Sequence, residues 1–171
     1  MFCQTKRNAP VSDTARIVFR VRWNERYRSG DFPTEPHPLV VQAASMLPPG
    51  RALDLACGAG RNARYLRDRG WSVLAIDNSD AALEIVRAMN IDTRKVDLER
   101  EPLPFDDESF DLVCIINFLH RPLFAEAKRV TRPNGIVAAA ICPTGKYSLT
   151  AEELRACFAE WTIVGNLIAI K

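Results

Sequence analysis

The sequence lacks a long apolar run, a paired set of cysteines and a cluster of histidines. No stretch of about 18 apolar residues occurs, and the first residues hold no continuous apolar segment, so we expect neither a membrane span nor a secretion signal. The five cysteines show no C-x-x-C spacing, so we expect reduced thiols and a cytoplasmic protein. The two histidines, His37 and His120, lie far apart, so the sequence predicts no metal site.

Within these limits, length and composition predict one domain. The chain has 171 residues, 47% of them hydrophobic, which suffices for a single sizeable core. The net charge is only +2, but the first thirty residues hold seven Lys or Arg and two acids. A basic arm can attract nucleic acid. Since this one has no Gly-Arg repeats, we expect a solvated helix face and no nucleic-acid partner.

Strand and helix patterns alternate along the chain, which is typical of a parallel sheet with helices on both faces. The expected strands are residues 51–56, 72–76, 93–97, 110–116 and 136–141, and the expected helices are 39–46, 61–69, 80–89, 121–132 and 151–159, with a turn at 133–135. Residues 12–28 fit either a helix capped by Ser12 or a strand. Residues 161–170 predict an antiparallel hairpin with a two-residue turn, Gly165-Asn166. The expected fold is therefore α/β and Rossmann-like: a doubly wound, mostly parallel sheet with a C-terminal antiparallel hairpin.

The most informative segment is residues 51–62, RALDLACGAGRN, where a short apolar strand gives way to Gly58-Ala59-Gly60 and then to a helix. Glycines let the chain turn sharply and let a ligand approach the main chain, while the helix directs its free N–H groups at that ligand. Asp77 ends the next strand, where a carboxylate can accept both hydroxyls of a ribose. Its alternative role is to cap the following helix, as Asn78 or Ser79 can also do. The pattern indicates a nucleoside-binding βαβ unit.

Two ligand classes use such a unit. Residues 58–63 fit the loose dinucleotide pattern G-x-G-x-x-G/A, which keeps open a nicotinamide or flavin oxidoreductase, and also a unit that binds nothing. Asp54 discriminates between the classes. A carboxylate at this strand end gains nothing from an anionic pyrophosphate, whereas it attracts a cationic ammonium or sulfonium group. The pattern therefore favours a cationic nucleoside ligand.

Residues 54–60, DLACGAG, resemble the first motif of the class I S-adenosylmethionine-dependent methyltransferases, in which an acid and two further residues precede a glycine-rich turn. Those enzymes also end in an antiparallel hairpin after five parallel strands. Residues 23–32 look like the segment that covers the cofactor in small bacterial methyltransferases of the tellurite-resistance and thiopurine types. Residues 105–113 and 132–135 look like the family's stretches before the fourth and fifth strands. The resemblance implies a basic arm and covering segment at 1–38 and one methyltransferase domain at 39–171.

The resemblance also implies a cofactor, S-adenosyl-L-methionine, and the residues that hold it. The implied assignments are Gly58 and Gly60 for the methionine part, Asp54 for its amino group, Asp77 for the ribose, Asp97 and Leu98 for the adenine, Asn117 for the methyl-transfer side, and Trp23 and Tyr27 for the cover. Asn78 is a further implied cofactor-binding residue. A packing role for the glycines and a solvated position for Asp97 are the alternatives.

Fewer residues point to the acceptor. His120, just past the fourth strand, is the candidate base because imidazole titrates near neutrality, and capping the next helix is its alternative role. Arg121 and Tyr147 are candidates for the substrate pocket. The last connection is shorter than in relatives, which keeps open a catalytically silent cofactor-binding partner or regulator. The expected function is methyl transfer to a small-molecule nucleophile, by a monomer or a homodimer.

Overall fold

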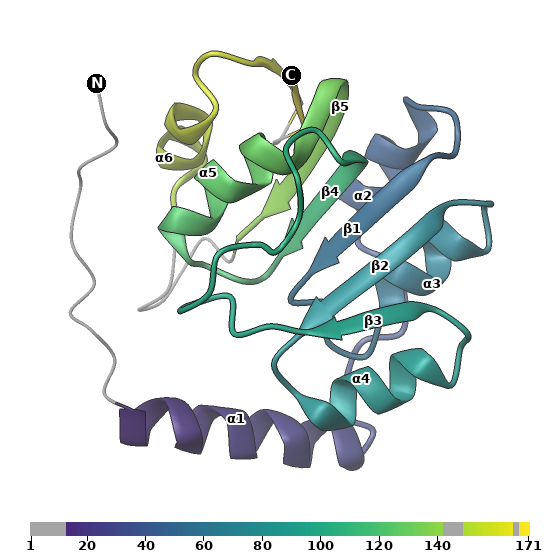
Figure 1. Ribbon diagram of the computed structural model, residues 1–171, viewed down its shortest axis with the longest axis vertical. Helices are drawn as coiled ribbons and strands as arrows, with labels where there is room; N and C mark the ends of the chain where they lie inside the picture. Colours follow the sequence, from purple (N-terminus) through teal and green to yellow (C-terminus); the bar gives the residue numbers. More distant parts are fainter. Residues whose placement is uncertain (1–12, 142–148, 166–167) are drawn as a thin grey trace.

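The chain folds around a seven-stranded sheet with helices on both faces, as a computed structural model that describes residues 13–141, 149–165 and 168–171 shows (Figure 1). The strands are β1 (Arg51–Leu55), β2 (Ser72–Asp77), β3 (Asp92–Lys95), β4 (Phe110–Ile116), β5 (Thr131–Ala140), β6 (Thr162–Val164) and β7 (Ile168–Ile170). Their order is β3-β2-β1-β4-β5-β7-β6. Strands β1 to β5 run parallel, and β7 pairs antiparallel with both β5 and β6. The expected fold class is confirmed.

Two apolar layers hold the sheet between its helices. The helices are α1 (Asp13–Arg28), α2 (Pro38–Ser45), α3 (Arg61–Arg67), α4 (Asp80–Arg87), α5 (Arg121–Val130) and α6 (Ala151–Cys157). Alternate residues of β4 show the layering, because Leu112 and Cys114 pack with α2, α3 and α4 while Val113 and Ile115 pack with α5 and α6. Nearly every residue of β4 is buried, as a strand covered on both faces requires. No helix in the described ranges is long and apolar enough to cross a bilayer.

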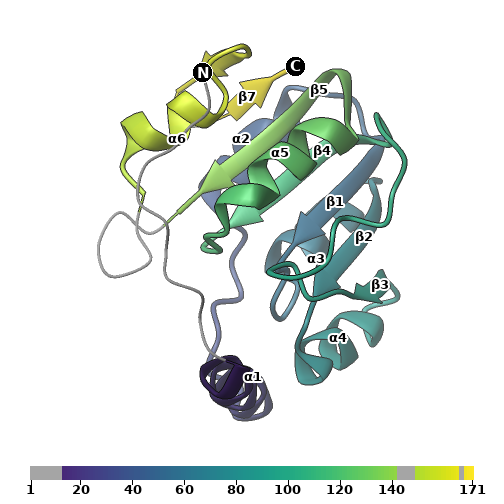
Figure 2. The same ribbon diagram turned by 60° about the vertical axis from the view of Figure 1, so that its left-hand side comes forward.

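Residues 13–28, whose pattern fits a helix or a strand, form helix α1. This helix lies outside the two layers, along the carboxyl edge of the sheet and beside α4 (Figures 1 and 2). The Ser79 hydroxyl donates to the Asn24 side chain at 2.5 Å and accepts from the Ala82 N–H as the cap of α4. One serine thus both starts α4 and fixes α1 against it. The expected cap Ser12 lies outside the described residues.

Several element boundaries differ from expectation, and three of the differences bear on the site or the sheet. Strand β3 ends at Lys95, so Asp97 and Leu98 lie in the turn that follows it. Helix α5 ends at Val130, because the Thr131 hydroxyl donates to the Ala127 carbonyl while Thr131 already pairs with Phe110. The expected turn at 133–135 is therefore an irregularity inside β5, where the register with β4 shifts. Strands β6 and β7 are separated by three residues rather than two, and Asn166 lies outside the described residues.

Candidate functional site

A cavity of about 480 Å³ opens at the carboxyl edge of the sheet. Its walls come from four strand ends and from the segment around α1: the residues lining it are Trp23, Arg26, Tyr27, Phe32, Pro33, Ala56, Cys57, Gly58, Ala59, Arg61, Asn62, Asp77, Asn78, Ser79, Val96, Asp97, Leu98, Glu99, Ile116, Asn117, Phe118 and Leu119. This edge is where open parallel α/β sheets bind ligands. The volume lies within the range of about 300–1,000 Å³ that is usual for small-molecule sites.

The floor of the cavity is the corner between the glycine-rich turn and the end of β2. The Gly58 N–H donates to one carboxylate oxygen of Asp77 at 2.9 Å, and the Ser79 N–H donates to the other at 2.8 Å. Burial raises the pKa of Asp77, and these backbone donors oppose that rise. Ser79, and not Asp77, is the cap of α4. Asp77 thus fixes the turn and still presents unused lone pairs toward the cavity.

Asp54 lies beneath the same turn and does not line the cavity. It is 1% exposed, and the Ala63 N–H donates to its carboxylate, yet its Oδ2 atom has no hydrogen-bond partner among the described residues. Burial, reinforced by the charge of Asp77, raises the pKa of Asp54 to about 7, while Ala63 and Arg61 oppose that rise. An uncompensated buried carboxylate is costly, so this end of the site favours a cation nearby.

The two glycines of the turn have different surroundings. Gly58 has a φ of 56°, and a Cβ added there would lie 2.8 Å from the Tyr27 hydroxyl, inside the cavity. Gly60 has a φ of 76°, and its added Cβ would meet Val86 of α4 at 2.7 Å. Gly60 therefore lets two helices pack closely, and only Gly58 bares main chain to the cavity.

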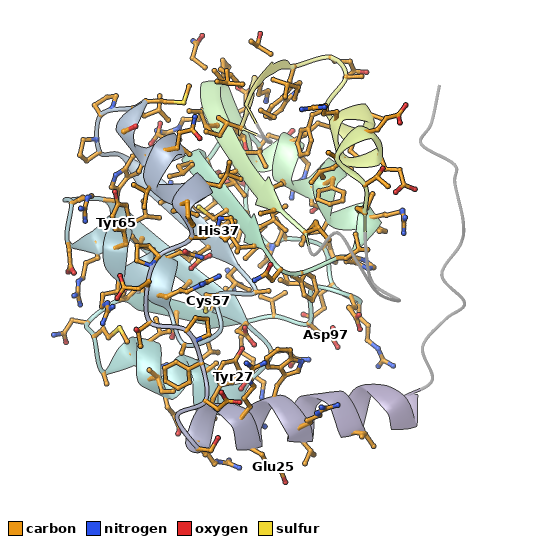
Figure 3. The ribbon with its side chains drawn as sticks, turned by 180° about the vertical axis from the view of Figure 1, so that it is seen from behind. Glu25, Tyr27, His37, Cys57, Tyr65 and Asp97 are labelled. Carbon is orange, nitrogen blue, oxygen red and sulfur yellow. The ribbon has the colours of Figure 1, made fainter. Side chains whose placement is uncertain are left out.

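Aromatic side chains cover the cavity from α1 and the linker after it. The rings of Trp23 and Tyr27 stack at 5.8 Å, and Phe32 lies 6.0 Å from Tyr27. Figure 3 shows Tyr27 on the side of α1 that faces the sheet, with Glu25 on the opposite side. Burial, and next the charge of Asp77, raises the pKa of Tyr27 far above its ordinary value, so this phenol stays protonated. The expected cover residues both line the cavity.

Side chains of α3 form hydrogen bonds with the linker between α1 and α2, residues 29–37, and the sequence patterns did not predict these contacts. Arg61 and Arg64 donate to the carbonyls of Glu35 at 3.3 Å and Thr34 at 2.8 Å. The buried Asn62 side chain accepts the His37 N–H at 2.9 Å. The three α3 residues lie within four positions of the glycine-rich turn, which is the only signal in the sequence that they belong to the site. Their partners lie 25 to 30 residues earlier in the chain, so no local pattern predicts these contacts.

The predicted acceptor residues lie at the border of the cavity or beyond it. Asn117, Phe118 and Leu119 line it, whereas His120 is the first residue outside and sits at the cap position of α5 without a side-chain capping bond. Arg121 lies 4.0 Å from Glu153 of α6 and does not line the cavity. Tyr147 lies outside the described residues. No group of three or more His, Cys, Asp or Glu in the described ranges could hold a metal ion.

Comparison with known proteins identifies the family. Residues 53–139 match the family model described as "Methyltransferase domain". Demethylmenaquinone methyltransferase of Renibacterium salmoninarum is 32% identical over 132 residues, 74% of this chain and 52% of that protein. The chain spans about half or less of the curated relatives it matches. It belongs to the class I S-adenosylmethionine-dependent methyltransferases, as its resemblance predicted.

Two solved structures share the fold. TehB of Haemophilus influenzae, from the predicted tellurite-resistance group, has a TM-score of 0.67 at 22% identity, over 83% of this chain and 57% of that one. The 1,6-didemethyltoxoflavin-N1-methyltransferase of Burkholderia thailandensis, with S-adenosylhomocysteine bound, has a TM-score of 0.66 at 19% identity, over 95% and 90%. These identities support the fold alone.

The residues present fit the family's cofactor, S-adenosylmethionine. The Asp54 carboxylate, whose Oδ2 has no partner among the described residues, lies behind the turn that lines the cavity and favours an ammonium group there through its charge. Gly58 bares main chain where a Cβ would intrude. Asp77 and Asp97 supply carboxylates along the same wall. The cavity is thus polar at its sheet wall and aromatic beneath α1, as a nucleoside ligand requires.

Proposed function

We propose that this protein binds S-adenosylmethionine in the cavity at the carboxyl edge and transfers its methyl group to a small-molecule nucleophile. The observation that carries the proposal is the meeting of Gly58, Asp77 and Asp97, from three different strand ends, in one cavity of about 480 Å³. Small acceptors are named for related proteins, namely demethylmenaquinone and didemethyltoxoflavin.

Each wall has a proposed role. Gly58 carries the methionine part on its bare main chain, and Asp77 accepts the ribose hydroxyls with the lone pairs that its two N–H donors leave unused. Asn78 adjoins the ribose. Asp97 and Leu98 hold the adenine from the turn after β3, although the Asp97 carboxylate also accepts the Glu99 N–H at 3.2 Å. Trp23 and Tyr27 exclude water above them.

The proposed methyl transfer requires little covalent chemistry from the protein's own residues. S-adenosylmethionine supplies a methyl group activated by a sulfonium, so the chain's own residues chiefly orient the acceptor. Asn117 and Phe118, which line the cavity after β4, are the proposed acceptor side. His120 is the proposed base for an acceptor that carries a proton, because it directly follows the lining residue Leu119. The protein is proposed to act in the reducing cytoplasm, as the reduced thiols of Cys57 and Cys114 allow.

Two measurements test the proposal. Calorimetry should show binding of S-adenosylhomocysteine and none of NADH, and the reverse would make the protein an oxidoreductase. A screen of quinols, heteroaromatic amines and thiols should then release homocysteine in a coupled assay with at least one acceptor. Binding without turnover on any of them would favour a silent cofactor-binding partner.

The His120 role is tested with any acceptor so found. His120→Ala should lower turnover by about 10²–10⁴-fold for an acceptor that must lose a proton, with S-adenosylhomocysteine affinity unchanged. Unchanged turnover with such an acceptor would remove His120 from the mechanism.

A further inference from the structure

A second hollow, of about 570 Å³, opens on the flank of α1 beside the cavity. The described residues that line it are Arg22, Trp23, Arg26 and Asp31, and we call it the α1 hollow. Trp23 and Arg26 also line the cavity, so the two spaces adjoin at these side chains. The proposed cofactor and acceptor roles leave Arg22 unused. A molecule bound beside the cofactor can therefore extend past Trp23 into the α1 hollow.

The charges around the α1 hollow are not balanced. Arg22 and Arg26 lie four residues apart on one helix, where side chains are neighbours and like charges repel. Arg26 is compensated in part, because its Nε donates to the Asp31 carbonyl at 2.7 Å and lies 3.4 Å from the Asp31 carboxylate. The Arg22 guanidinium has no hydrogen bond or ion pair among the described residues. Glu25 lies on the side of α1 opposite Tyr27 and does not line the hollow (Figure 3).

Two guanidiniums and one carboxylate leave a single positive charge in the α1 hollow, which matches one ligand carboxylate. A phosphate monoester carries nearly two negative charges at pH 7 and would exceed that balance. A guanidinium binds a carboxylate through two parallel N–H bonds and stays charged at every ordinary pH. The neighbouring Trp23 ring is 44% exposed and supplies a flat apolar surface. These features together fit a flat aromatic acid.

We propose that Arg22, assisted by Arg26, binds a carboxylate of the methyl acceptor, and that the protein thereby selects aromatic acids whose carboxylate lies away from the methylated atom. The inference rests on the proposed methyl transfer and names the class of acceptor for it. The reacting atom of the acceptor then lies in the cavity near Asn117 and Phe118, while its carboxylate lies in the α1 hollow. Arg22 is thus a specificity residue in acceptor binding.

The test uses a carboxylate and its neutral counterpart on the protein saturated with S-adenosylhomocysteine. 2-Naphthoate is a flat aromatic acid, and 2-naphthamide has nearly the same shape without the charge. The chain has three tryptophans, and the NMR indole signal of Trp23, identified by its absence in Trp23→Phe, reports binding beside the α1 hollow. The variants are Arg22→Gln and the matched control Arg28→Gln. Both arginines are exposed on α1, but Arg28 lines neither space.

The wild-type protein should bind 2-naphthoate about 3- to 10-fold more tightly than 2-naphthamide, the range for partly exposed charged hydrogen bonds, and the Trp23 signal should shift. Arg22→Gln should abolish this preference, while Arg28→Gln keeps it. Equal affinities of the two probes for the wild-type protein, binding of neither probe, or a preference retained in Arg22→Gln would overturn the inference.

Cofactor binding separates this inference from the proposed function. S-adenosylhomocysteine should bind Arg22→Gln as tightly as the wild-type protein, because Arg22 does not line the cavity. A weaker affinity in that variant would assign Arg22 to the cofactor and overturn its role toward the acceptor. Failure of the wild-type protein to bind S-adenosylhomocysteine refutes the proposed function, whereas binding of it without a preference between the two probes refutes this inference alone.

Discussion

The two edges of the parallel sheet differ in how completely their polar groups are paired. At the amino edge, the Asp111 carboxylate accepts the Arg51 N–H at 2.7 Å and the Arg132 guanidinium at 3.0 Å. Arg129 donates to the carbonyls of Phe105 and Leu103 and to two carboxylates. These charged groups fasten loops to strands, and each has its partners within the chain.

At the carboxyl edge, by contrast, a buried carboxylate is left with an unpaired oxygen. Asp54 Oδ2 has no partner in the described part of the chain, and Asp77 shares the same corner. Burying polar groups without full pairing costs stability, and natural proteins accept such costs mainly at functional sites. The charged groups at the amino edge therefore stabilise the fold, while the carboxyl edge retains polar atoms that can interact with a ligand.

The largest contrast should appear when one acid is removed from each edge. Asp77→Ala should weaken S-adenosylhomocysteine binding by about 1.5–3 kcal/mol, the range for a hydrogen bond to a charged acceptor, and should destabilise the fold because two N–H donors lose their acceptor. Asp111→Ala should destabilise the fold by a similar amount and leave affinity unchanged. Calorimetry and urea unfolding on both variants measure this. Equal affinities for Asp77→Ala and the wild-type protein would contradict the ribose role.

A pH series tests how much the burial of the Asp54 carboxylate costs in stability. The pKa of Asp54 is raised from 3.8 to about 7, so the folded state holds this proton more tightly than the unfolded state. Its contribution to stability is therefore complete below about pH 4 and is lost as the pH rises to about 7. Between pH 5 and 8 the free energy of unfolding should fall by about 1–3 kcal/mol through Asp54.

Asp54→Asn removes this titration and should flatten the pH dependence of urea unfolding. Asp77 has a pKa raised in the same direction and keeps its own contribution in the variant. An identical slope in Asp54→Asn would mean that the buried carboxylate is compensated by a group outside the described residues.

A smaller effect distinguishes the stability cost of a left-handed backbone from a loss of ligand affinity in the cavity. Gly58 and Gly30 both have positive φ, 56° and 75°, but an added Cβ meets Tyr27 only at Gly58 and open space at Gly30. Both alanine variants should lose about 1–2 kcal/mol of stability through the left-handed backbone. Only Gly58→Ala should also weaken S-adenosylhomocysteine binding. Equal affinities in the two variants would show that the ligand does not approach this turn.

Local patterns located the carboxyl edge well. Gly58, Asp77 and Asp97 follow separate strands, and they share one cavity because the ends of parallel strands meet at one edge. The same patterns could not distinguish Gly60, whose closest neighbour is Val86 of another helix, from Gly58. The difference depends on how α3 packs against α4, which no spacing within the turn reveals.

Contacts between distant segments decided the remaining elements. Residues 13–28 fit two periodicities, and the helix is the one that brings Asn24 to Ser79, 55 residues away. Helix α5 ends early because Thr131 pairs with Phe110 at the start of β4, against a helical pattern that continues to residue 132. Tertiary pairing thus overrides local preference at each of these points.

The smallest expected effect concerns the cover over the carboxyl edge. Trypsin should cut after the exposed Arg22, Arg26 and Arg28, and S-adenosylhomocysteine should slow this cleavage several-fold, because the ligand adds contacts beneath Trp23 and Tyr27.

The contact between Asn24 and Ser79 offers a way to sharpen this test. Asn24→Ala removes the acceptor for the Ser79 hydroxyl, so α1 should be cut faster without ligand while the ligand still protects it. Cleavage after Arg155, an exposed residue of α6 that does not line the cavity, provides the internal control in every digest and should not change. If α1 were cut at the same rate with and without S-adenosylhomocysteine while Arg155 cleavage stayed constant, then α1 would be a fixed wall of the site, and the ligand would enter without displacing it.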